Sequence, residues 1–416
     1  MPAPLRQPEP QRIQQDLQDL ALLRDPDLAG WSRPTFTGVE RESRRWVAAR
    51  MRATSLDVHV DGIGNLIGVL PGQGAGGKAI VVGSHTDTVE GGGRFDGTVG
   101  VLGALEAVRL LEESGIKLRH DLRVVDYFNE EPNRFGLSCL GSRALASNLS
   151  PDHLATVDED GATLAEALQS QGLDPADIPA CAWSANEVLA SLELHIEQGP
   201  ILEQQGAGLG VVTAIAGIAR LRAVFKGRRD HAGTRPMALR QDAGCAAAGT
   251  VLAIEAIGSS GADAVGTVGE IRFTPEATNV VSEEALLTAE FRSSDAGWFG
   301  LAREQLEQAV ERESRRRGVH GSVLWLPPEP PTAMDPRLSE LIGRSIAGLG
   351  HDFLRLYSGA GHDAVQLARL GPAGMIFLPS KDGRSHTPEE WTDLADIALG
   401  VHALAASIVQ IDGWEP

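Results

Sequence analysis

The segment AIVVGSHTDTVEGGGRFDGTVGVLGALEAVRLLEESGIKLRHDLRVVDYF spans residues 79–128. Its apolar run at 79–82 predicts a parallel strand that is buried on both faces. The helical apolar spacing over 98–113, closed by Ser114-Gly115, predicts a helix, and 122–128 predicts the next strand. Because strand, loop, helix and strand form a βαβ unit, the segment predicts an α/β fold around a parallel sheet.

Elements of this α/β type lie on both sides of a stretch with a different order. That stretch predicts strand, helix, two strands, helix and strand, which is the ferredoxin-like β-α-β-β-α-β order. Its elements are expected at 211–226, 237–257, 265–273, 284–292, 297–317 and 321–326. The flanking elements are helices at 11–24, 39–53 and 337–348, a strand pair within 56–70, strands at 353–357 and 375–378, and a C-terminal helix. We therefore expect a discontinuous α/β catalytic domain, residues 1–210 and 328–416, with an inserted domain at 211–327.

The composition excludes several classes of partner. The 416 residues include 37 Lys and Arg against 56 Asp and Glu, for a net charge of −19. Nucleic acids and anionic membranes attract clustered cations, so neither is an expected partner. Cys139, Cys181 and Cys245 are too few for a disulfide framework, which favours a reducing cytoplasm. The first 25 residues contain no apolar signal segment, and no run of 18 apolar residues predicts a membrane span.

Histidines and carboxylates recur at the ends of predicted strands and in glycine-rich loops. They are His85 and Asp87 in GSHTD, Asp96 in GGGRFDGTVG, Glu130 and Glu131 in FNEEP, His195 in LELHIEQG, and His386 in SKDGRSHTPEEW. Each is ordinary by itself, because most such residues are solvated or structural. Their conjunction is informative, since open α/β sheets place their sites at the carboxyl ends of strands. The remaining histidines outside any motif are expected to be structural, namely His59, His120, His153, His320, His351 and His402.

This set of side chains suits one or two divalent ions such as Zn²⁺ or Mn²⁺, which accept imidazole and carboxylate ligands. Asp87, two residues from His85 on an extended chain, can support the imidazole from behind. One glutamate of the Glu130–Glu131 pair would then be free to act as a general base toward water. A serine-based amidase is disfavoured, because no G-x-S-x-G nucleophile motif occurs in the chain.

The same residues resemble the binuclear metallo-amidohydrolases that include aminoacylases and carboxypeptidase G. The shared motifs, in order, are GSHTDTV, GGGRFDGTVGVLGALE, FNEE, GSRALA, LELHIEQGPILE, DHAGTRPM, TNVV, FRSSD, SGAGHDA and GRSHTPEEW. The resemblance is narrower to the N-carbamoyl-L-amino-acid hydrolase and allantoate amidohydrolase branch. In that branch the histidine of ELHIEQGP, Glu193–Pro200, stands where peptidase relatives usually have a carboxylate ligand. The similarity runs from about Asp61 to Trp391.

The resemblance implies two divalent ions per chain, of Zn, Mn, Co or Ni, bridged by Asp96. One ion would add His85 and His195, and the other Glu131 and His386. Glu130 would be the general base, and Asp87 would orient a metal-bound histidine. The implied substrate contacts are His231, Asn279, Arg292, Gln198 and the backbone of Gly359, Ala360 and Gly361. The family fold is a metal-binding α/β domain with an inserted dimerisation or lid domain, so a homodimer is implied, with His231 reaching a substrate across it.

The function implied is hydrolysis of a linear C–N bond, most simply the N-carbamoyl group of an L-amino acid or a ureido acid such as allantoate. An arginine fork pairs well with a carboxylate, so Arg292 suits a small anionic substrate. Each of these residues also has a purely structural interpretation. Arg292 would then form a surface ion pair, His231 would be a loop residue, and Asn279 would be a turn residue. Other readings of the whole chain are an N-acyl-amino-acid amidase and a non-catalytic binding protein. Pro132-Asn133-Arg134 departs from the family pattern, which bears on substrate choice more than on metal binding.

Overall fold

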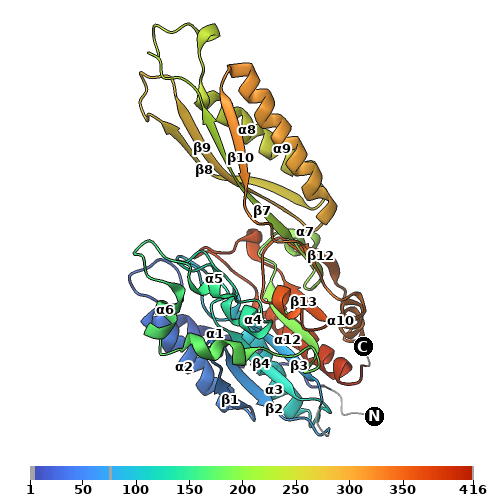
Figure 1. Cartoon of the computed structure of the whole chain (residues 1–416). Coiled ribbons are helices and arrows are strands. Elements are labelled where there is room, and N and C mark those ends of the chain that lie inside the picture. Colours follow the sequence, from blue (N-terminus) through green and yellow to red (C-terminus); the bar gives the residue numbers. More distant parts are fainter. Residues whose placement is uncertain (1–4, 75–76, 415–416) are drawn as a thin grey trace. The chain divides into compact units, whose positions relative to one another are not determined.

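The computed structural model describes residues 5–74 and 77–414. The chain forms two compact units. The first unit contains Met1–Thr213, Met334–Leu356 and Gly361–Pro416, and the inserted unit contains Ala214–Ala333 and Tyr357–Ala360 (Figure 1). The two units are described separately below.

The larger of the two sheets in the described residues has nine strands and a parallel centre. Its order is β1-β2-β4-β3-β5-β13-β6-β11, with β12 also paired to β6. Strands β4, β3, β5 and β13 run parallel in that order, whereas the pairs β1·β2, β2·β4, β13·β6 and β6·β11 are antiparallel. The bounds are β1 Asp57–Val60, β2 Leu66–Leu70, β3 Ala79–His85, β4 Leu122–Tyr127, β5 Val188–Ile196, β6 Gly210–Ile215, β11 Thr332–Ala333, β12 Leu354–Ser358 and β13 Ala373–Leu378. The predicted α/β class is confirmed.

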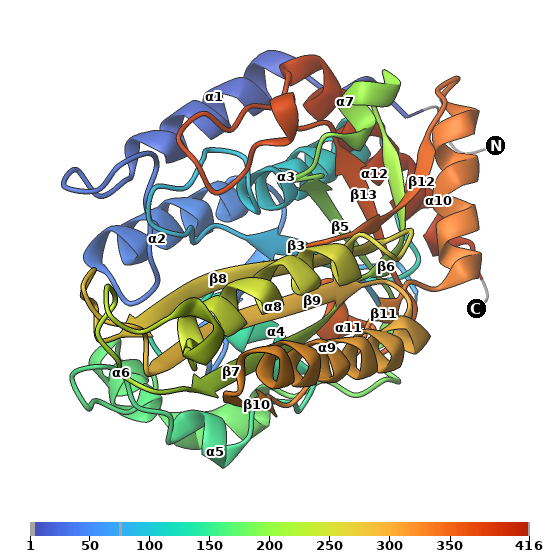
Figure 2. The same ribbon diagram turned by 90° about the horizontal axis from the view of Figure 1, so that it is seen from above.

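Strand β3 is buried on both faces, as its apolar run predicts. Ile80 and Val82 belong to the same apolar cluster as helices α3 and α12, whereas Val81 packs in a separate cluster with Leu145 and Leu367. Alternate residues of β3 therefore pack against helices on the two opposite faces of the sheet. Helix α1 packs on α3, as Figure 2 shows, and α10 packs on α12. The helices are α1 Pro10–Leu22, α2 Gly38–Arg52, α3 Thr98–Glu113, α10 Pro336–Gly348, α11 Ala364–Leu367 and α12 Leu394–Asp412, with the short α7 Ile201–Gln205 and 3-10 turn η3 Lys381–Gly383.

The connection from β4 to β5 contains short helices that the sequence pattern does not reveal. They are α4 Leu140–Leu145, α5 Pro151–Leu154, α6 Leu164–Ser170 and the 3-10 segment η1 Pro175–Cys181. None is long enough to show several turns of apolar periodicity. Helix α6 begins at a capping box in which Thr163 and Glu166 satisfy each other's backbone N–H groups. Local caps therefore define α5 and α6 more than an apolar stripe does, whereas α4 has no side-chain cap.

The inserted unit has the order β-α-β-β-α-β. Its antiparallel sheet runs β10-β7-β9-β8, and α8 and α9 lie side by side against it (Figure 1). Alternate residues of β9 are buried, so one face of the sheet supplies the core with Phe225, Leu287 and Phe291. The bounds are β7 Gly217–Lys226, α8 Ala243–Gly258, β8 Ala264–Thr274, β9 Glu284–Ser293, α9 Ala296–Arg317 and β10 His320–Trp325.

Two predicted elements are wrong in their bounds. The helix expected at 237–257 begins at Ala243, because the Asp242 side chain accepts from Cys245 N and caps it there; residues 237–239 form only a 3-10 turn, η2. The strand expected at 211–226 is two strands, β6 and β7, which pair with different partners. They separate at Ala216, whose N–H donates to the Ser358 carbonyl at 2.8 Å. Apolar alternation continues through this change of partner, so the pattern alone does not mark it.

Helix α12 is the one helix in the described residues that is long and apolar enough to cross a membrane. More than half of its apolar window is buried in the protein, against α3, α10 and β13. Core helices of this kind commonly have the same composition, so the observation is weak evidence for a membrane span.

Candidate metal centre

The predicted metal ligands of the first unit converge at the carboxyl ends of the parallel strands. His85 is the last residue of β3, and His195 lies next to the end of β5. Glu130 and Glu131 follow β4, and His386 lies in the loop after β13. These strands are neighbours in the sheet, so their ends bring residues separated by up to three hundred positions to one edge.

Asp96 lies at the centre of this arrangement. Its Oδ1 is 3.3 Å from His195 Nε2 and 3.6 Å from His85 Nε2. Its Oδ2 is 3.4 Å from His386 Nε2, which is itself 3.3 Å from Glu131 Oε1. The two oxygens of one carboxylate therefore face two different groups of ligands.

The backbone at Gly97 allows the Asp96 loop to approach the histidines. Gly97 adopts a φ of 61°, which favours glycine, and a Cβ there would lie 2.3 Å from His85 Nε2. Its N–H lies 3.2 Å from His195 Nε2 and is oriented toward it. Any side chain at this position would displace an imidazole, so the glycine is a requirement of the site.

Asp87 connects His85 to the paired glutamates. Its carbonyl oxygen lies 3.0 Å from His85 Nδ1, closer than its carboxylate Oδ1 at 3.6 Å. The carboxylate accepts from the backbone N–H groups of Glu130 and Glu131, each at 3.2 Å. Asp87 thus orients the imidazole mainly through its main chain and holds the Glu130–Glu131 segment through its side chain.

Glu130 is buried and lies beside the first histidine. Its Oε2 is 3.6 Å from His85 Nε2, and its Oε1 accepts a weak hydrogen bond from Cys139 Sγ at 3.4 Å. Burial raises the pKa of Glu130 well above its ordinary value, and the attraction of His85 offsets this only in part. A buried carboxyl with a raised pKa is suited to accept and return a proton.

The charges of the centre reinforce one another. Burial opposes ionisation of Asp96, but the three surrounding imidazoles lower its pKa well below the ordinary range. Hydrogen bonds to Asp96 and Glu131 raise the pKa of His386 to about 11. The cluster therefore retains negative charge on its central carboxylate and can be neutralised by cations.

Ser385 and Glu390 support Asp96, and sequence reasoning missed both. Ser385 Oγ donates to Asp96 Oδ2 at 2.6 Å and also contacts Glu390 Oε2 at 2.8 Å. Glu390 Oε1 accepts from the backbone N–H groups of Phe95 and Asp96, at 2.8 and 3.1 Å. Both residues lie in the quoted GRSHTPEEW motif, but only the fold shows that this loop reaches the Asp96 loop.

A second group, Glu193, His362 and Asp363, was also missed as part of the site. The His362 ring lies 4.5 Å from that of His195, centroid to centroid. Glu193 accepts from Ser84 Oγ at 2.9 Å and from Ala364 N at 3.2 Å. Burial lowers the pKa of His362 well below its ordinary value, which disfavours a charge on this imidazole. The signal was present in SGAGHDA and ELHIEQGP, which contain these residues.

Gln198 is the predicted substrate residue that lies in this centre. Its Nε2 donates to Asp96 Oδ2 at 2.6 Å, and its buried Oε1 has no hydrogen-bond partner in the described residues. Gln198, His386 and Asn129 all adopt left-handed φ values, 58°, 56° and 53°. Non-glycine residues rarely adopt such values, and those that do concentrate at functional sites.

The inserted unit contains most of the other predicted substrate residues. Arg292 donates through Nη1 to the Gly359 carbonyl at 2.9 Å and pairs through Nε with Glu290 at 2.7 Å. Ala360 is held by Ser358, and Gly361 is an exposed residue of the first unit. His231 and Asn279 are both exposed, and Ala232 N donates to the Asn279 carbonyl at 3.0 Å. Arg292 and Gly359 are therefore neighbours, and so are the segments of His231 and Asn279.

The Pro132-Asn133-Arg134 segment forms a closed turn directly after the paired glutamates. The Asn133 side-chain oxygen accepts from Phe135 N at 2.9 Å, and Asn133 N donates to the Leu137 carbonyl at 3.0 Å. Arg134 Nε pairs with Asp158 at 2.8 Å. The departure from the family pattern thus has its own local hydrogen bonds, and the Asn133 amide also donates to Asn129 Oδ1, whose own amide donates to the Glu131 carbonyl.

The donor atoms fit divalent metal. One ligand atom each from His85, Asp96 and His195 lies within 4.8 Å of the others, and the same holds for Asp96, Glu131 and His386. Imidazole nitrogens with carboxylate oxygens are the ligands that zinc and similar ions accept. Burying several carboxylates together is costly unless cations compensate them. A further triplet, Glu193, His195 and His362, has similar spacing but shares His195.

Replacing Glu390 is expected to weaken metal binding without removing a ligand. Glu390→Gln should raise the metal dissociation constant by about 10- to 100-fold, as for other residues that orient ligands from outside the coordination sphere. The control is Glu389→Gln, its exposed neighbour, which pairs with Arg384 and Thr387 and should leave metal affinity unchanged. Competition with a metal-sensitive dye measures both constants. Equal constants for the two variants would show that Glu390 does not position Asp96.

The comparisons with known proteins agree with this geometry. Residues 81–410 match peptidase family M20/M25/M40. The N-carbamoyl-L-amino acid amidohydrolase of Geobacillus stearothermophilus is 37% identical over 96% of this chain and 98% of its own length. A ureidoglycolate hydrolase of Oryza sativa subsp. japonica is 36% identical over 96% of this chain and 84% of its own. A solved hydantoinase/carbamoylase family amidase from Burkholderia multivorans has a TM-score of 0.90 at 31% identity, over 99% of both chains. The chain therefore belongs to peptidase family M20/M25/M40, as a metal-using amidohydrolase similar to its hydantoinase/carbamoylase members.

Proposed function

We propose that this protein hydrolyses the N-carbamoyl group of an L-amino acid, or a related ureido acid such as allantoate, with two divalent ions. The observation that carries the proposal is Asp96, whose two oxygens face separate groups of ligands. The first ion would be held by His85, His195 and Asp96, and the second by Asp96, Glu131 and His386. Zn, Mn, Co and Ni all suit such ligands. When bound, the ions supply Lewis-acid activation of water and of the substrate carbonyl.

In this proposal Glu130 is the general base. Its buried carboxylate accepts a proton from the attacking water and returns it to the departing nitrogen, so the scissile C–N bond breaks with a neutral amine leaving. Asp87 holds the backbone of Glu130 and so fixes where its carboxylate lies. Hydrolysis of an N-carbamoyl amino acid then yields the free amino acid, ammonia and carbon dioxide.

The proposed substrate contacts are polar side chains that keep some hydrogen-bonding capacity beyond the contacts described above. The buried Gln198 Oε1, unpartnered in the described residues, can accept from a ureido N–H near Asp96. Arg292 presents a guanidinium fork suited to the substrate carboxylate, beside the Gly359–Gly361 backbone. We assign Asn279 to the same role, as a polar side chain exposed on the inserted domain at 211–327. Because the chain carries a net charge of −19, attraction of an anionic substrate must come from local cations.

The substrate proposal is tested by products from the metal-reconstituted enzyme. N-carbamoyl-L-amino acids and allantoate should release ammonia, and the former should release free amino acid in equal amount. N-acyl-L-amino acids, whose hydrolysis releases an intact carboxylic acid, should react far more slowly. Faster turnover of the N-acyl compounds would make the protein an N-acyl-amino-acid amidase. No turnover of any of these compounds by fully metal-loaded protein would favour a binding protein.

We further propose a homodimer in the cytoplasm, in which the inserted domain supplies His231 to the partner's site. The exposed edge strand β8 supports the dimer, because Val265, Ile271 and Phe273 present apolar side chains there. His231 Nδ1 accepts from Gly233 N and Thr234 N, at 3.0 and 3.2 Å, which leaves Nε2 directed away from the loop's own backbone. An imidazole placed this way can stabilise a developing oxyanion.

Mixing two inactive variants tests the shared site. His231→Ala and Glu130→Gln chains should each be inactive alone. If each site needs both subunits, a mixed dimer has one intact site of two, so a 1:1 mixture after random subunit exchange should recover up to about one quarter of wild-type activity. The activity of the mixture is measured after subunit exchange has been verified by mass. Absence of recovery in verified heterodimers would place His231 in the site of its own chain or outside any site.

A further inference from the structure

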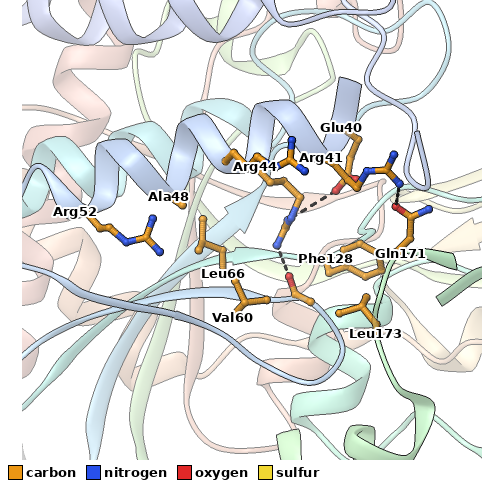
Figure 3. A pocket seen from close by; sticks show the side chains of 12 residues that line it. Glu40, Arg41, Arg44, Ala48, Arg52, Val60, Leu66, Phe128, Gln171 and Leu173 are labelled. Atoms are coloured by element: carbon orange, nitrogen blue, oxygen red, sulfur yellow. Dashed lines mark hydrogen bonds and ion pairs between the residues drawn. The ribbon is translucent and has the colours of Figure 1, made fainter. Parts of the chain in front are cut away.

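A pocket of the first unit lies between helix α2 and strands β1 and β2. Its volume is about 310 Å³, at the small end of the range for ligand pockets. Helix α2 supplies one wall, with Arg41, Arg44, Arg45, Ala48 and Arg52 among the lining residues. Figure 3 shows Arg44 extending from α2 toward Phe128, and Arg52 beside Ala48 and Leu66. The pocket thus combines several guanidinium groups with apolar surface.

The spacing of the lining residues explains this wall. Positions 41, 45, 48 and 52 recur at intervals of three and four, so they share one face of the helix. Ala48 interrupts the row of arginines with a small side chain, and this leaves room between the longer ones. The net charge of the chain is −19, so this concentration of cations is unusual for the molecule.

The arginines differ in whether their charge is already satisfied. Arg44 is used by the protein, because it lies 3.1 Å from Asp126 Oδ2 and 3.5 Å from Glu40 Oε1 and also donates to the Gly64 carbonyl. Arg41 donates to Gln171 Oε1. Arg45 and Arg52 are exposed and make no hydrogen bond or ion pair with any described residue. Two guanidinium groups at the pocket are therefore free to bind an anion.

The floor of the pocket is apolar and closely packed. Leu66 and Phe128 are only 2% and 4% exposed, and Leu173 completes the lining on the far side. The Phe128 ring packs edge-on against Phe36, with centroids 5.8 Å apart. The one carboxylate in the lining, Glu40, is buried and faces Arg44, so it is not available to a cationic ligand.

We propose that this pocket binds a small organic carboxylate with a compact apolar body, at a site separate from the metal centre. The carboxylate pairs with Arg45 and Arg52, since arginine forks bind carboxylates through charge-assisted hydrogen bonds. The apolar body packs against Leu173 over the nearly buried Leu66 and Phe128, and this contact removes the ligand's own apolar surface from water. An inorganic anion would use only the guanidinium groups and an uncharged ligand only the floor, so both should bind more weakly.

Calorimetric titration of the metal-loaded full-length protein with hydrocinnamate tests the site. We expect saturable binding that Arg45→Gln/Arg52→Gln weakens about tenfold or more, as expected for lost charge-assisted bonds. The matched control is Arg312→Gln/Arg316→Gln, two exposed arginines of α9 that also have no partner in the described residues. It should bind like the wild type. Both variants should fold, because none of these four side chains is buried or paired.

Two further measurements test where hydrocinnamate binds and which of its chemical groups the pocket recognises. Arg292→Gln should leave hydrocinnamate binding unchanged, whereas inorganic phosphate and hydrocinnamyl alcohol should each bind wild-type protein several-fold more weakly. The proposal is wrong if the Arg45/Arg52 variant binds as tightly as the control. It is also wrong if Arg292→Gln abolishes binding, if phosphate or the alcohol binds as tightly as hydrocinnamate, or if no saturable binding occurs. None of these results bears on hydrolysis at the metal centre, so the two proposals fail independently.

Discussion

Glu130→Gln should lower kcat by about 10²–10⁴-fold while bound metal stays at the wild-type level, as for loss of a general base. The glutamine retains the shape of the side chain but cannot accept the proton of the attacking water. Glu130 is suited to this role by its burial and by the resulting rise of its pKa. Steady-state kinetics with an N-carbamoyl-L-amino acid and metal analysis of the same samples provide the measurement.

The control for this substitution is Glu42→Gln, which makes the same chemical change on the exposed surface of α2. Glu42 has no hydrogen bond or ion pair with any described residue, so its replacement should leave kcat unchanged. Full activity of Glu130→Gln with metal bound would remove Glu130 from the mechanism. Loss of metal together with activity would instead make Glu130 a ligand, which the present assignment excludes.

Asp96→Asn should nearly abolish both metal binding and hydrolysis. The carboxylate faces His195 with one oxygen and His386 with the other, so one change affects both groups of ligands. We expect the metal dissociation constant to rise by more than about 100-fold, the upper end of the effect seen for residues that only orient ligands. Elemental analysis after dialysis should then find little metal per chain.

The matched control is Asp160→Asn, an exposed aspartate whose side chain has no partner in the described residues. This variant should retain wild-type metal content and activity. If Asp96→Asn lost one ion and kept the other, Asp96 would be an ordinary ligand of a single ion. If it kept both, the carboxylate would not be a ligand at all.

Much of the fold could be predicted from local pattern. The apolar run before His85 and the helix at 98–113 indicate a βαβ unit, and the structure contains it as β3, α3 and β4. Such patterns can be recognised in the sequence because buried strands and long helices repeat their apolar residues at fixed intervals. The short helices between β4 and β5 contain too few turns for this signal, and the division of 211–226 into β6 and β7 depends on strand partners that lie elsewhere in the chain.

The candidate centre likewise contains residues that the sequence could predict and residues that it could not. His85, Glu130 and His195 could be selected because each lies at the end of a predicted strand, and parallel strand ends meet at one edge. Glu390 and His362 lie in motifs that the sequence shows, but their contacts with Asp96 and His195 join loops that are distant in the chain, so their place in the site could not be predicted. The pocket beside the arginines of α2 could not be predicted either, since the sequence of a helix does not show which strands lie opposite it.

By itself, the sequence determined the α/β class, the β-α-β-β-α-β order of the inserted stretch, and the residue types available for metal chemistry. These follow from periodicity and from motifs, which are properties of neighbouring residues. Only the tertiary structure decided that the oxygens of Asp96 face separate histidines, that Asp87 supports His85 through its main chain, and that Arg45 and Arg52 line a pocket. These are distances between segments far apart in the chain, and they exist only when the sheet has set its strand order and the loops have packed on its edge.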